Sequence, residues 1–216
     1  MRLDSYLVEI GNLTSRARAK HAILEGHVKV NDILVTKPSY DVVYSDNVEV
    51  EEGLDKPAGY WKLKNINDKT GIIQQGNRVL DIGSSAGGFL MFASEIASSV
   101  HGIEFSREFH QQLKKLEHEC PNITVEFDDV FNIPVDRLGQ FDVMTLDITA
   151  NPISSIQALE HVLPALKNGG ILLIVLKLPK DKEHELHLSK LSSIGLEIMD
   201  IIEPGKQEVY VIARKL

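Results

Sequence analysis

The chain has 216 residues, of which 43% are hydrophobic and 25% are charged, so it is long enough for one ordinary domain and a small one. Its formal net charge is −8, and its single cysteine, Cys120, excludes a disulfide framework and fits a reducing cytoplasm. The longest strongly apolar run, at residues 171–176, is too short to cross a bilayer, and no secretion signal is visible, so a cytoplasmic protein without membrane contact is expected.

The first 50 residues predict a small α+β unit. Apolar residues between positions 3 and 10 recur with helical spacing, and Gly11 follows as a helix stop. Thr14 or Ser15 can then cap a second helix that runs to Leu24. Asn-Asp at residues 31–32 tolerates the tight turn of a hairpin. The expected strands of this unit are residues 27–30, 33–35 and 48–50.

Basic side chains are concentrated in the same unit, although the whole chain is acidic. Nucleic-acid binding depends on a local basic patch rather than on net charge. The pattern allows two interpretations, a solvated helix face or a surface that contacts RNA phosphates. The candidate RNA-binding residues are Arg2, Arg16, Arg18, Lys20 and Lys29, with His21 and His27 among them.

A polar segment with Gly and Pro, residues 51–58, is the predicted linker to a second domain at residues 59–216. Strands and helices alternate in this domain, which predicts a mostly parallel sheet covered by helices on both faces. The last two strands leave no room for a helix between them, so they are expected to pair as a hairpin, with one strand antiparallel to the others. The predicted strands are residues 78–82, 100–104, 123–127, 141–147, 171–176, 196–202 and 209–213, and the predicted helices are residues 87–97, 107–119, 153–166 and 183–192.

A glycine-containing loop joins the first strand of this domain to its helix, which is where doubly wound sheets bind ligands. Glycines let the backbone pass close to a ligand, and the start of a helix offers free N–H groups. Glu104 ends the next strand, where an acidic residue can accept hydrogen bonds from ribose hydroxyls. The candidate cofactor-binding residues are Asp81, Gly83, Ser84, Ser85, Gly87, Gly88, Phe89, Glu104 and Asp129.

Two kinds of cofactor fit such a loop, a dinucleotide and S-adenosylmethionine. A pyrophosphate loop has the pattern Gly-x-Gly-x-x-Gly, but here Ser85 stands at the second glycine. Asp81 precedes the loop, where a carboxylate would oppose phosphate but suits the cationic end of S-adenosylmethionine, which is therefore the expected cofactor. Alternatively, Gly87 and Gly88 could serve close packing, and the aspartates at residues 128–129 could cap a helix.

Four further ionisable residues are placed for catalysis. Lys62 lies on a helix before the first strand, Asp147 and Lys177 end the fourth and fifth strands, and Glu208 begins the last strand. Strand ends meet at the ligand crevice, so Asp147 and Lys177 are expected to converge there. Desolvation and a second cation lower the pKa of a lysine, so Lys177 beside Lys62 could remove a proton from an acceptor hydroxyl. An ordinary surface ion pair is the alternative for any one of the four, and no metal site emerges from the spacing.

These motifs carry a resemblance to known families. Residues 59–216 resemble the FtsJ-like family of ribose 2′-O-methyltransferases, whose Lys-Asp-Lys-Glu tetrad matches Lys62, Asp147, Lys177 and Glu208. Residues 2–4, 14–19, 26–31 and 37–39 resemble the ribosomal-protein-S4-like RNA-binding domain. The two domains in this order resemble the hemolysin-A-like (TlyA) family of rRNA methyltransferases, whose cofactor loop is close to residues 83–89.

The resemblance implies a small N-terminal α+β S4-like domain followed by a Rossmann-like class I methyltransferase domain with a seven-stranded, mostly parallel sheet. It also implies S-adenosylmethionine as cofactor, Lys177 as base for a 2′-hydroxyl, and RNA as partner, most plainly rRNA, free or in ribosomal particles; no obligate protein partner is inferred. The chain departs from the family patterns at Ala86, where the FtsJ-like loop usually has Pro, and at residues 147–152 and 178–180.

Three other functions are compatible with parts of the sequence. The chain could be an RNA-binding protein on a non-catalytic methyltransferase scaffold, which the complete tetrad disfavours. It could also methylate a base or a small molecule. Base N-methylation commonly uses an Asn/Asp-Pro-Pro-Tyr/Phe loop after the fourth strand, where this chain has Asp147-Ile148-Thr149-Ala150. A dehydrogenase is least favoured, because of Ser85.

Overall fold

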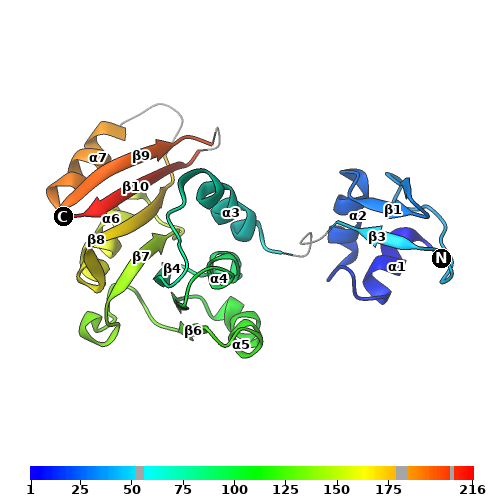
Figure 1. Ribbon diagram of the computed structural model, residues 1–216, viewed down its shortest axis with the longest axis horizontal. Coiled ribbons are helices and arrows are strands. Elements are labelled where there is room, and N and C mark those ends of the chain that lie inside the picture. Colours follow the sequence, from blue (N-terminus) through cyan, green and yellow to red (C-terminus); the bar gives the residue numbers. More distant parts are fainter. Residues whose placement is uncertain (52–55, 179–183, 205–206) are drawn as a thin grey trace. The chain divides into compact units, whose positions relative to one another are not determined.

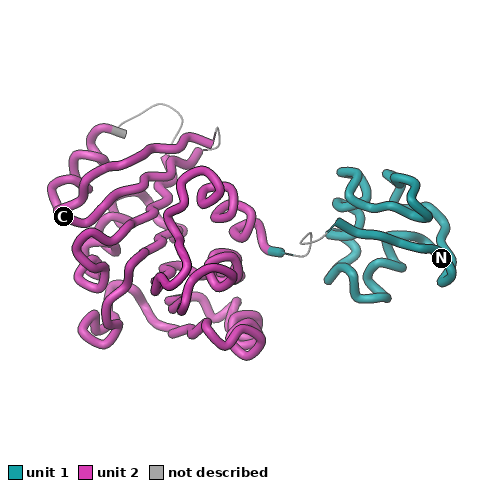
Figure 2. Tube along the Cα trace, in the orientation of Figure 1, with its two compact units in different colours: residues 1–56 teal, residues 57–216 magenta. Residues whose placement is uncertain are grey.

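The computed structural model describes residues 1–51, 56–178, 184–204 and 207–216. The chain forms two compact units, Met1–Lys56 and Pro57–Leu216 (Figure 2). Most of the expected linker, residues 52–55, lies outside the described residues, as do the Pro179-Lys180 pair and the expected start of a helix at Glu183.

Unit 1 packs two helices against a three-stranded antiparallel sheet with the order β2-β1-β3. Ser15, not Thr14, caps the second helix, since its Oγ accepts a hydrogen bond from the backbone N–H of Arg18 at 3.3 Å. Asn31 and Asp32 have φ angles of 51° and 64°, the left-handed conformation that a tight two-residue hairpin requires. The elements are α1 (Leu3–Glu9), α2 (Arg16–Leu24), β1 (Val28–Val30), β2 (Ile33–Leu34) and β3 (Val48–Val50).

Unit 2 is built on a seven-stranded sheet with the order β6-β5-β4-β7-β8-β10-β9 (Figure 1). Neighbouring strands are parallel except that β10 pairs antiparallel with both β8 and β9. This confirms the predicted doubly wound fold and its closing hairpin. The strands are β4 (Arg78–Ile82), β5 (Ser99–Ile103), β6 (Ile123–Glu126), β7 (Phe141–Leu146), β8 (Leu166–Leu176), β9 (Leu196–Ile202) and β10 (Val209–Lys215).

Helices cover both faces of this sheet because its central strands are apolar on both sides. Along β8, Leu172 and Ile174 join a core with α6 and α7, whereas Leu173 and Val175 join a second core with α3, α4 and α5. Successive side chains of a strand point to opposite faces, so one apolar run supplies two cores. The helices are α3 (Ala58–Thr70), α4 (Gly88–Ser94), α5 (His110–Glu119), α6 (Pro152–Val162) and α7 (His184–Ser193), with single 3₁₀ turns η1 (Arg107–Phe109), η2 (Val135–Arg137) and η3 (Leu163–Ala165).

Several predicted boundaries in unit 2 are wrong. The helix expected at residues 87–97 ends at Ser94, where the chain tightens into hydrogen bonds from Glu95 N to Phe92 O and from Ile96 N to Ala93 O. The helix expected at residues 153–166 ends at Val162 and is followed by η3, and the strand expected at residues 171–176 begins earlier, at Leu166. None of these three changes moves the carboxyl end of a strand, and β4 still lies between β5 and β7, where the strand order reverses and ligands bind in such sheets.

Candidate active site

The loop between β4 and α4 requires glycine at its start. Gly83 has a φ of 83°, and a Cβ atom added there would lie 2.7 Å from the carbonyl oxygen of Asp147. The loop backbone therefore passes directly over the end of β7. Ser85 also takes a left-handed conformation, with a φ of 48°. Its backbone N–H donates to Oε2 of Glu104 at 2.7 Å, which ties the loop to the end of β5.

The next two glycines serve packing, which was the alternative to cofactor contact. A Cβ atom on Gly87 would lie 2.8 Å from Leu116 of α5, and one on Gly88 would lie 2.5 Å from the backbone nitrogen of Tyr60 in α3. Phe89 is buried against the same stretch of α3, since a Cβ atom on Gly59 would lie 3.3 Å from its ring. These contacts hold α3, and with it Lys62, against the loop.

Asp81 lies beneath the loop rather than in it. Its side chain is buried, and its Oδ1 accepts a hydrogen bond from the Thr145 hydroxyl at 2.6 Å. Its Oδ2 is buried with no hydrogen-bond partner in the part of the chain that the structure describes. Burial raises the pKa of Asp81 to about 6, although the hydrogen bond from Thr145 acts in the opposite direction; the hydroxyl of Ser84, which is itself buried, donates to the backbone carbonyl of Asp81 at 3.3 Å.

A cavity of about 650 Å³ opens beside the loop, within the size range of small-molecule sites. Glu104 lines it and holds its two carboxylate oxygens against the backbone N–H groups of Ser85 and Ser106, at 2.7 and 2.6 Å. Asp129 also lines the cavity, but its carboxylate is engaged locally, accepting from Phe131 N at 3.0 Å and Asn132 Nδ2 at 2.8 Å. Asp129 therefore caps a turn while bordering the cavity.

The charge of this cavity discriminates between S-adenosylmethionine, the expected cofactor, and a dinucleotide, the alternative. Among the described residues that line it, the charged ones are all acidic. A dinucleotide would bring its pyrophosphate into this negative field, whereas S-adenosylmethionine carries an ammonium and a sulfonium. The residues present fit S-adenosylmethionine, and the buried oxygen of Asp81, which has no hydrogen-bond partner among the described residues, adds to the negative charge beneath the loop. The acidic lining residues are Glu104, Glu108, Asp128, Asp129 and Asp147.

All four tetrad candidates meet at one point. Lys62 Nζ lies 2.9 Å from Oδ2 of Asp147 and 3.0 Å from Oε2 of Glu208. Lys177 Nζ lies 3.6 Å from Oδ1 of Asp147 and donates to the carbonyl of Ile148 at 3.2 Å. Asp147 is thus shared by the two lysines, but Lys62 is the closer and is held by two carboxylates.

The carboxylates keep Lys62 charged. Burial by itself would lower its pKa, but Asp147 and Glu208 outweigh burial and raise the pKa above the usual range. Glu208 shows the reciprocal effect, since the lysine overcomes burial and lowers its pKa. The sequence interpretation missed Tyr210, whose hydroxyl donates to Glu208 at 3.2 Å and whose ring lies 5.5 Å from Lys62 Nζ. The available signal was the spacing of two residues between Glu208, which directly precedes β10, and Tyr210, because residues two apart in an extended segment point to the same side.

A second cavity of about 290 Å³ adjoins the larger one at the tetrad. Lys62, Asp147 and Lys177 line it, and it shares Gly83, Asp147 and other loop residues with the larger cavity. The sequence also missed aromatic residues at the rim of the larger cavity, among which Phe105 and Phe131 have exposed fractions of 75% and 45%. Phe105 directly follows Glu104 in the sequence, so its position next to a predicted cofactor residue could have indicated that it borders the cavity.

The basic candidates of unit 1 fall into two groups. Arg2 donates twice to the carboxylate of Asp4, at 2.9 Å each, and Arg16 donates to the same carboxylate at 3.1 Å. Asp4 is buried, and Arg2, followed by Arg16, holds the pKa of its carboxyl far below the usual range. Both arginines nevertheless keep half or more of their side chains exposed. Arg18, Lys20 and Lys29 are exposed on α2 and β1.

Comparisons with known proteins agree with the division of the chain into two units. Residues 1–48 match the model of the S4 domain family, and residues 58–214 match that of the FtsJ-like methyltransferase family. The chain is 30% identical over 183 residues to ribosomal RNA large subunit methyltransferase E of Syntrophobacter fumaroxidans, covering 72% of this chain and 87% of that protein. It is 30% identical over 159 residues to hemolysin A of Brachyspira hyodysenteriae, covering 69% of this chain.

Solved structures share the fold. A fibrillarin pre-rRNA processing protein of Methanococcus jannaschii superposes with a TM-score of 0.64 at 20% identity, covering 81% of each chain.

The match to hemolysin A spans 65% of that relative's length, just under two thirds. No helix in the described part of the chain has the length and apolar character that a membrane span needs.

Proposed function

This chain belongs to the FtsJ-like methyltransferase family, and from that premise we propose that it transfers a methyl group from S-adenosylmethionine to a ribose 2′-hydroxyl of RNA. The observation that carries the proposal is the cluster of Lys62, Asp147, Lys177 and Glu208 beside the loop that follows β4. The names of two relatives, an rRNA methyltransferase and a pre-rRNA processing protein, support rRNA as the substrate.

The larger cavity is the proposed cofactor site. Gly83 and Ser85 would border the ligand, Glu104 would accept hydrogen bonds from its ribose, and Asp81 and the acidic lining would favour its positive charge. Asp129 would contribute from the far rim, and Ser84, Gly87, Gly88 and Phe89 would act by shaping the loop. Bound S-adenosylmethionine would supply an activated methyl group.

The tetrad would prepare the acceptor hydroxyl. A ribose hydroxyl is a poor nucleophile unless a base removes its proton in the transition state. We assign the base to Lys177, because Lys62 is committed to two carboxylates that keep it charged. Lys62 would instead hold Asp147 and Glu208 in place, and Asp147 would orient Lys177. The 290 Å³ cavity that the two lysines line, next to the cofactor cavity, is the proposed place of the acceptor nucleotide.

Unit 1 would hold the RNA. Unit 1 resembles S4-like modules in sequence, and its residues 1–48 match the model of the S4 domain family. Arg2 and Arg16, oriented by Asp4, and the exposed Arg18, Lys20 and Lys29 would contact phosphates, which position an RNA without reading its bases. Specificity for RNA over DNA would come from the 2′-hydroxyl itself.

The test is methyl transfer from labelled S-adenosylmethionine to RNA that lacks this modification, supplied both free and in ribosomal particles, followed by digestion to nucleosides. We expect the label on a 2′-O-methyl nucleoside. Lys177→Ala should abolish transfer while leaving S-adenosylmethionine affinity near normal. Lys115→Ala, which removes a lysine with a 74% exposed side chain on α5, is the matched control and should transfer normally.

Three outcomes would contradict parts of this proposal. Label on a base would refute the 2′-hydroxyl as acceptor. Full activity of the Lys177→Ala variant would refute the assigned base. Intact cofactor binding without transfer to either RNA substrate would favour a different acceptor or a scaffold that binds RNA without modifying it.

A further inference from the structure

Some residues border both the cavity of about 650 Å³ and the cavity of about 290 Å³, and so lie between the proposed cofactor and acceptor sites. They are Gly83, Ser85, Asp147 and Thr149. Gly83 has no side chain, the Asp147 carboxylate pairs with both lysines of the tetrad, and Ser85 belongs to the loop beside the cofactor. The proposed mechanism gives no role to Thr149.

Thr149 is the apex of a tight turn between β7 and α6. The backbone N–H of Ala150 donates to the carbonyl oxygen of Ile148 at 3.0 Å, which closes a three-residue turn around Thr149. The same carbonyl oxygen accepts a hydrogen bond from Lys177 Nζ at 3.2 Å, and Asn151 caps the start of α6 with its side chain. Thr149 therefore projects from a fixed stretch of backbone, next to the proposed base.

The hydroxyl of Thr149 is uncommitted. Its side chain is exposed, and its Oγ1 has no hydrogen-bond partner within residues 1–51, 56–178, 184–204 and 207–216. The hydroxyl of Thr145, one turn back on β7, donates instead to Asp81 at 2.6 Å. A threonine hydroxyl can donate one hydrogen bond and accept two. Thr149 therefore offers a donor at the border of the acceptor cavity.

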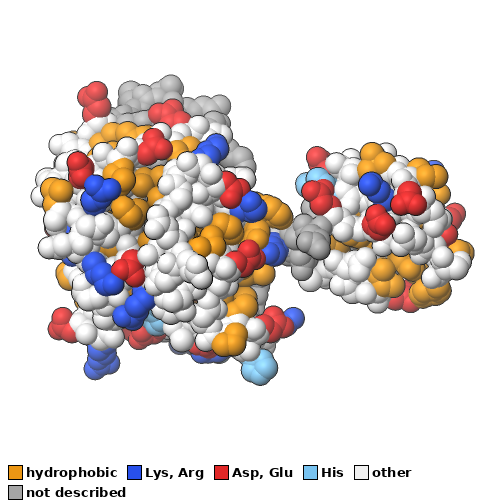
Figure 3. All heavy atoms as spheres, in the orientation of Figure 1, with side chains coloured by type: hydrophobic (Ala, Val, Ile, Leu, Met, Phe, Trp, Pro, Cys, Tyr) orange, Lys and Arg blue, Asp and Glu red, His pale blue; other side chains and the backbone are white. Residues whose placement is uncertain are grey.

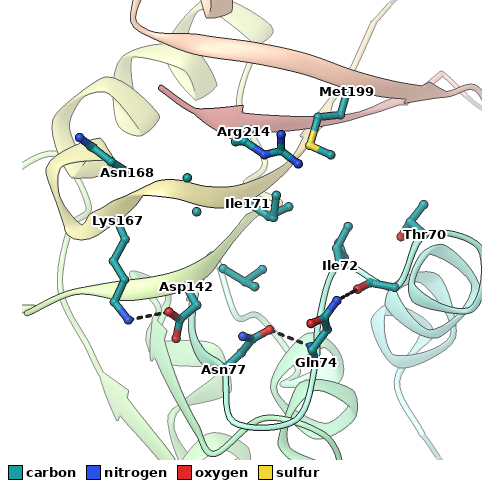
Figure 4. A pocket seen from close by; sticks show the side chains of 14 residues that line it. Thr70, Ile72, Gln74, Asn77, Asp142, Lys167, Asn168, Ile171, Met199 and Arg214 are labelled. Carbon is teal, nitrogen blue, oxygen red and sulfur yellow. Dashed lines mark hydrogen bonds and ion pairs between the residues drawn. The ribbon is translucent and has the colours of Figure 1, made fainter.

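Polar groups in another hollow of unit 2 are paired with each other. This hollow, of about 410 Å³, lies at the amino ends of β7 and β8, where Lys167 pairs with Asp142 at 2.5 Å (Figure 4). Thr70 also lines it, and the Thr70 hydroxyl donates to the carbonyl of Ile66 in its own helix at 2.7 Å. Thr70 is thus a matched threonine that borders neither the cofactor cavity nor the acceptor cavity.

Charge by itself does little to place an RNA on unit 2. The chain has 23 Lys and Arg against 31 Asp and Glu, and on the face of unit 2 that Figure 3 shows, basic side chains are interspersed with acidic ones. Transfer requires close alignment, since a misplacement of about 1 Å can cost on the order of 100-fold in rate. Directional hydrogen bonds at the acceptor cavity therefore have to fix the nucleotide.

We propose that the Thr149 hydroxyl donates a hydrogen bond to the phosphate on the 3′ side of the nucleotide that is methylated. The inference rests on the proposed ribose 2′-O-methyltransferase function and adds a residue that holds the acceptor. The reacting 2′-oxygen is a poor partner for Thr149, because a donor there would stabilise the lone pair that attacks, and an acceptor would compete with Lys177 for the proton. The 3′-oxygen lies on the neighbouring ribose carbon and carries this phosphate, and threonine hydroxyls contact phosphate oxygens in nucleic-acid complexes.

The test compares the full wild-type chain with Thr149→Val, which removes the hydroxyl at nearly constant volume, and with Thr149→Ser, which keeps it. Thr70→Val is the matched control. Each protein receives two RNA oligonucleotides that contain the nucleotide methylated by the wild-type chain. One is natural, and the other has a neutral methylphosphonate in place of the phosphate on the 3′ side of that nucleotide. The measurements are kcat and KM for RNA, S-adenosylmethionine affinity and thermal unfolding.

On natural RNA we expect Thr149→Val to raise KM about tenfold, the effect of removing one hydrogen bond to a charged group. The value of kcat should stay near that of the wild type, because the phosphate is bound alike in the ground state and in the transition state. Thr149→Ser and Thr70→Val should keep the wild-type KM. The methylphosphonate should raise KM for those two variants and for the wild type, and much less for Thr149→Val, which has already lost the contact.

The outcomes separate this inference from the proposed function. A wild-type KM for Thr149→Val, or an equal effect of the methylphosphonate on Thr149→Val and the wild type, would overturn the contact while the proposed methyl transfer stands. Weaker S-adenosylmethionine binding by Thr149→Val with an unchanged KM for RNA would also overturn it, and would assign Thr149 to the cofactor site. If the wild-type chain methylates no 2′-hydroxyl of RNA, the proposed function fails and this inference fails with it.

Discussion

At the scale of single residues, the site depends on how carboxylates are distributed among cations. Lys62 and Lys177 are both lysines at predicted places, yet Lys62 pairs with two carboxylates at 2.9 and 3.0 Å while Lys177 lies 3.6 Å from one. In the proposed mechanism, that difference gives Lys62 a structural role and Lys177 the role of the base that acts on the acceptor. The same reasoning applies to unit 1, where Arg2 and Arg16 both donate hydrogen bonds to the buried carboxylate of Asp4.

Asp81 provides a prediction about stability and pH. Its folded-state pKa of about 6 lies above its ordinary value of 3.8, so ionising it opposes folding. This cost is small near pH 4, accumulates as the pH rises from about 4 to about 6, and levels off above that at no more than ~3 kcal/mol. Asp81→Asn should therefore raise the unfolding temperature by several degrees at pH 8 and by much less at pH 4.

Thermal unfolding of the wild-type chain and the Asp81→Asn variant at both pH values checks this prediction. S-adenosylmethionine affinity should fall in the variant, because the substitution removes the negative charge beneath the loop. A lower unfolding temperature for the variant at pH 8 would show that the Asp81 carboxylate stabilises the fold, contrary to the expected sign.

Glu104 provides a second prediction. Both of its oxygens accept hydrogen bonds from backbone N–H groups, of Ser85 and of Ser106. Glu104→Gln replaces one acceptor by an NH₂ group that faces a donor, and removing a hydrogen bond to a charged group costs about 1.5–3 kcal/mol. We expect S-adenosylmethionine affinity to drop about tenfold or more, measured by calorimetry. Glu160→Gln, an exposed glutamate of α6 that does not line the cavity, is the control and should bind nearly as the wild type does.

At the scale of elements, the contact between α3 and α4 sets the position of Lys62. Gly88 of α4 faces the backbone of Tyr60, where an added Cβ atom would lie 2.5 Å from nitrogen. Backbone cannot yield as a side chain can, so Gly88→Ala must push α3 outward. Overpacking of this kind costs about 1–3 kcal/mol, and the displaced Lys62 would loosen its pairs with Asp147 and Glu208.

We therefore expect Gly88→Ala to lower both the unfolding temperature and the rate of methyl transfer. Gly59→Ala is the graded control at the same contact, because its Cβ atom would lie 3.3 Å from the Phe89 ring and no closer than 3.5 Å to backbone. The decreases in unfolding temperature and in methyl-transfer rate should be clearly smaller for Gly59→Ala than for Gly88→Ala. Equal losses in the two variants would contradict a close backbone contact as the feature that positions α3.

At the scale of the whole molecule, the two units have separate cores. The buried apolar side chains of unit 1 form one cluster, and those of unit 2 form two clusters between Tyr60 and Ala213. A chain of residues 57–216 should therefore fold and bind S-adenosylmethionine with normal affinity, since the cavity is lined by unit 2 alone. Its KM for RNA should rise at least tenfold, as unit 1 carries five proposed phosphate contacts. An unchanged KM would remove unit 1 from RNA binding.

The sequence by itself determined the fold class and named several of the residues that the structure brings together around the loop after β4. Alternating strands and helices predicted the doubly wound sheet and its closing hairpin, because burial follows the period of each element and is therefore visible locally. The glycine-containing loop, Glu104 and the tetrad could be named because strand ends converge on one crevice. The fold was confirmed, and the roles of the site residues stay predictions.

Only the tertiary structure decided which groups meet and how. The pairs of Lys62 join residues 85 and 146 positions apart, and sequence spacing does not specify which carboxylate a lysine reaches. The packing of Gly87 and Gly88, the burial of Asp81 and the hydrogen bond from Tyr210 to Glu208 depend in the same way on contacts between distant elements.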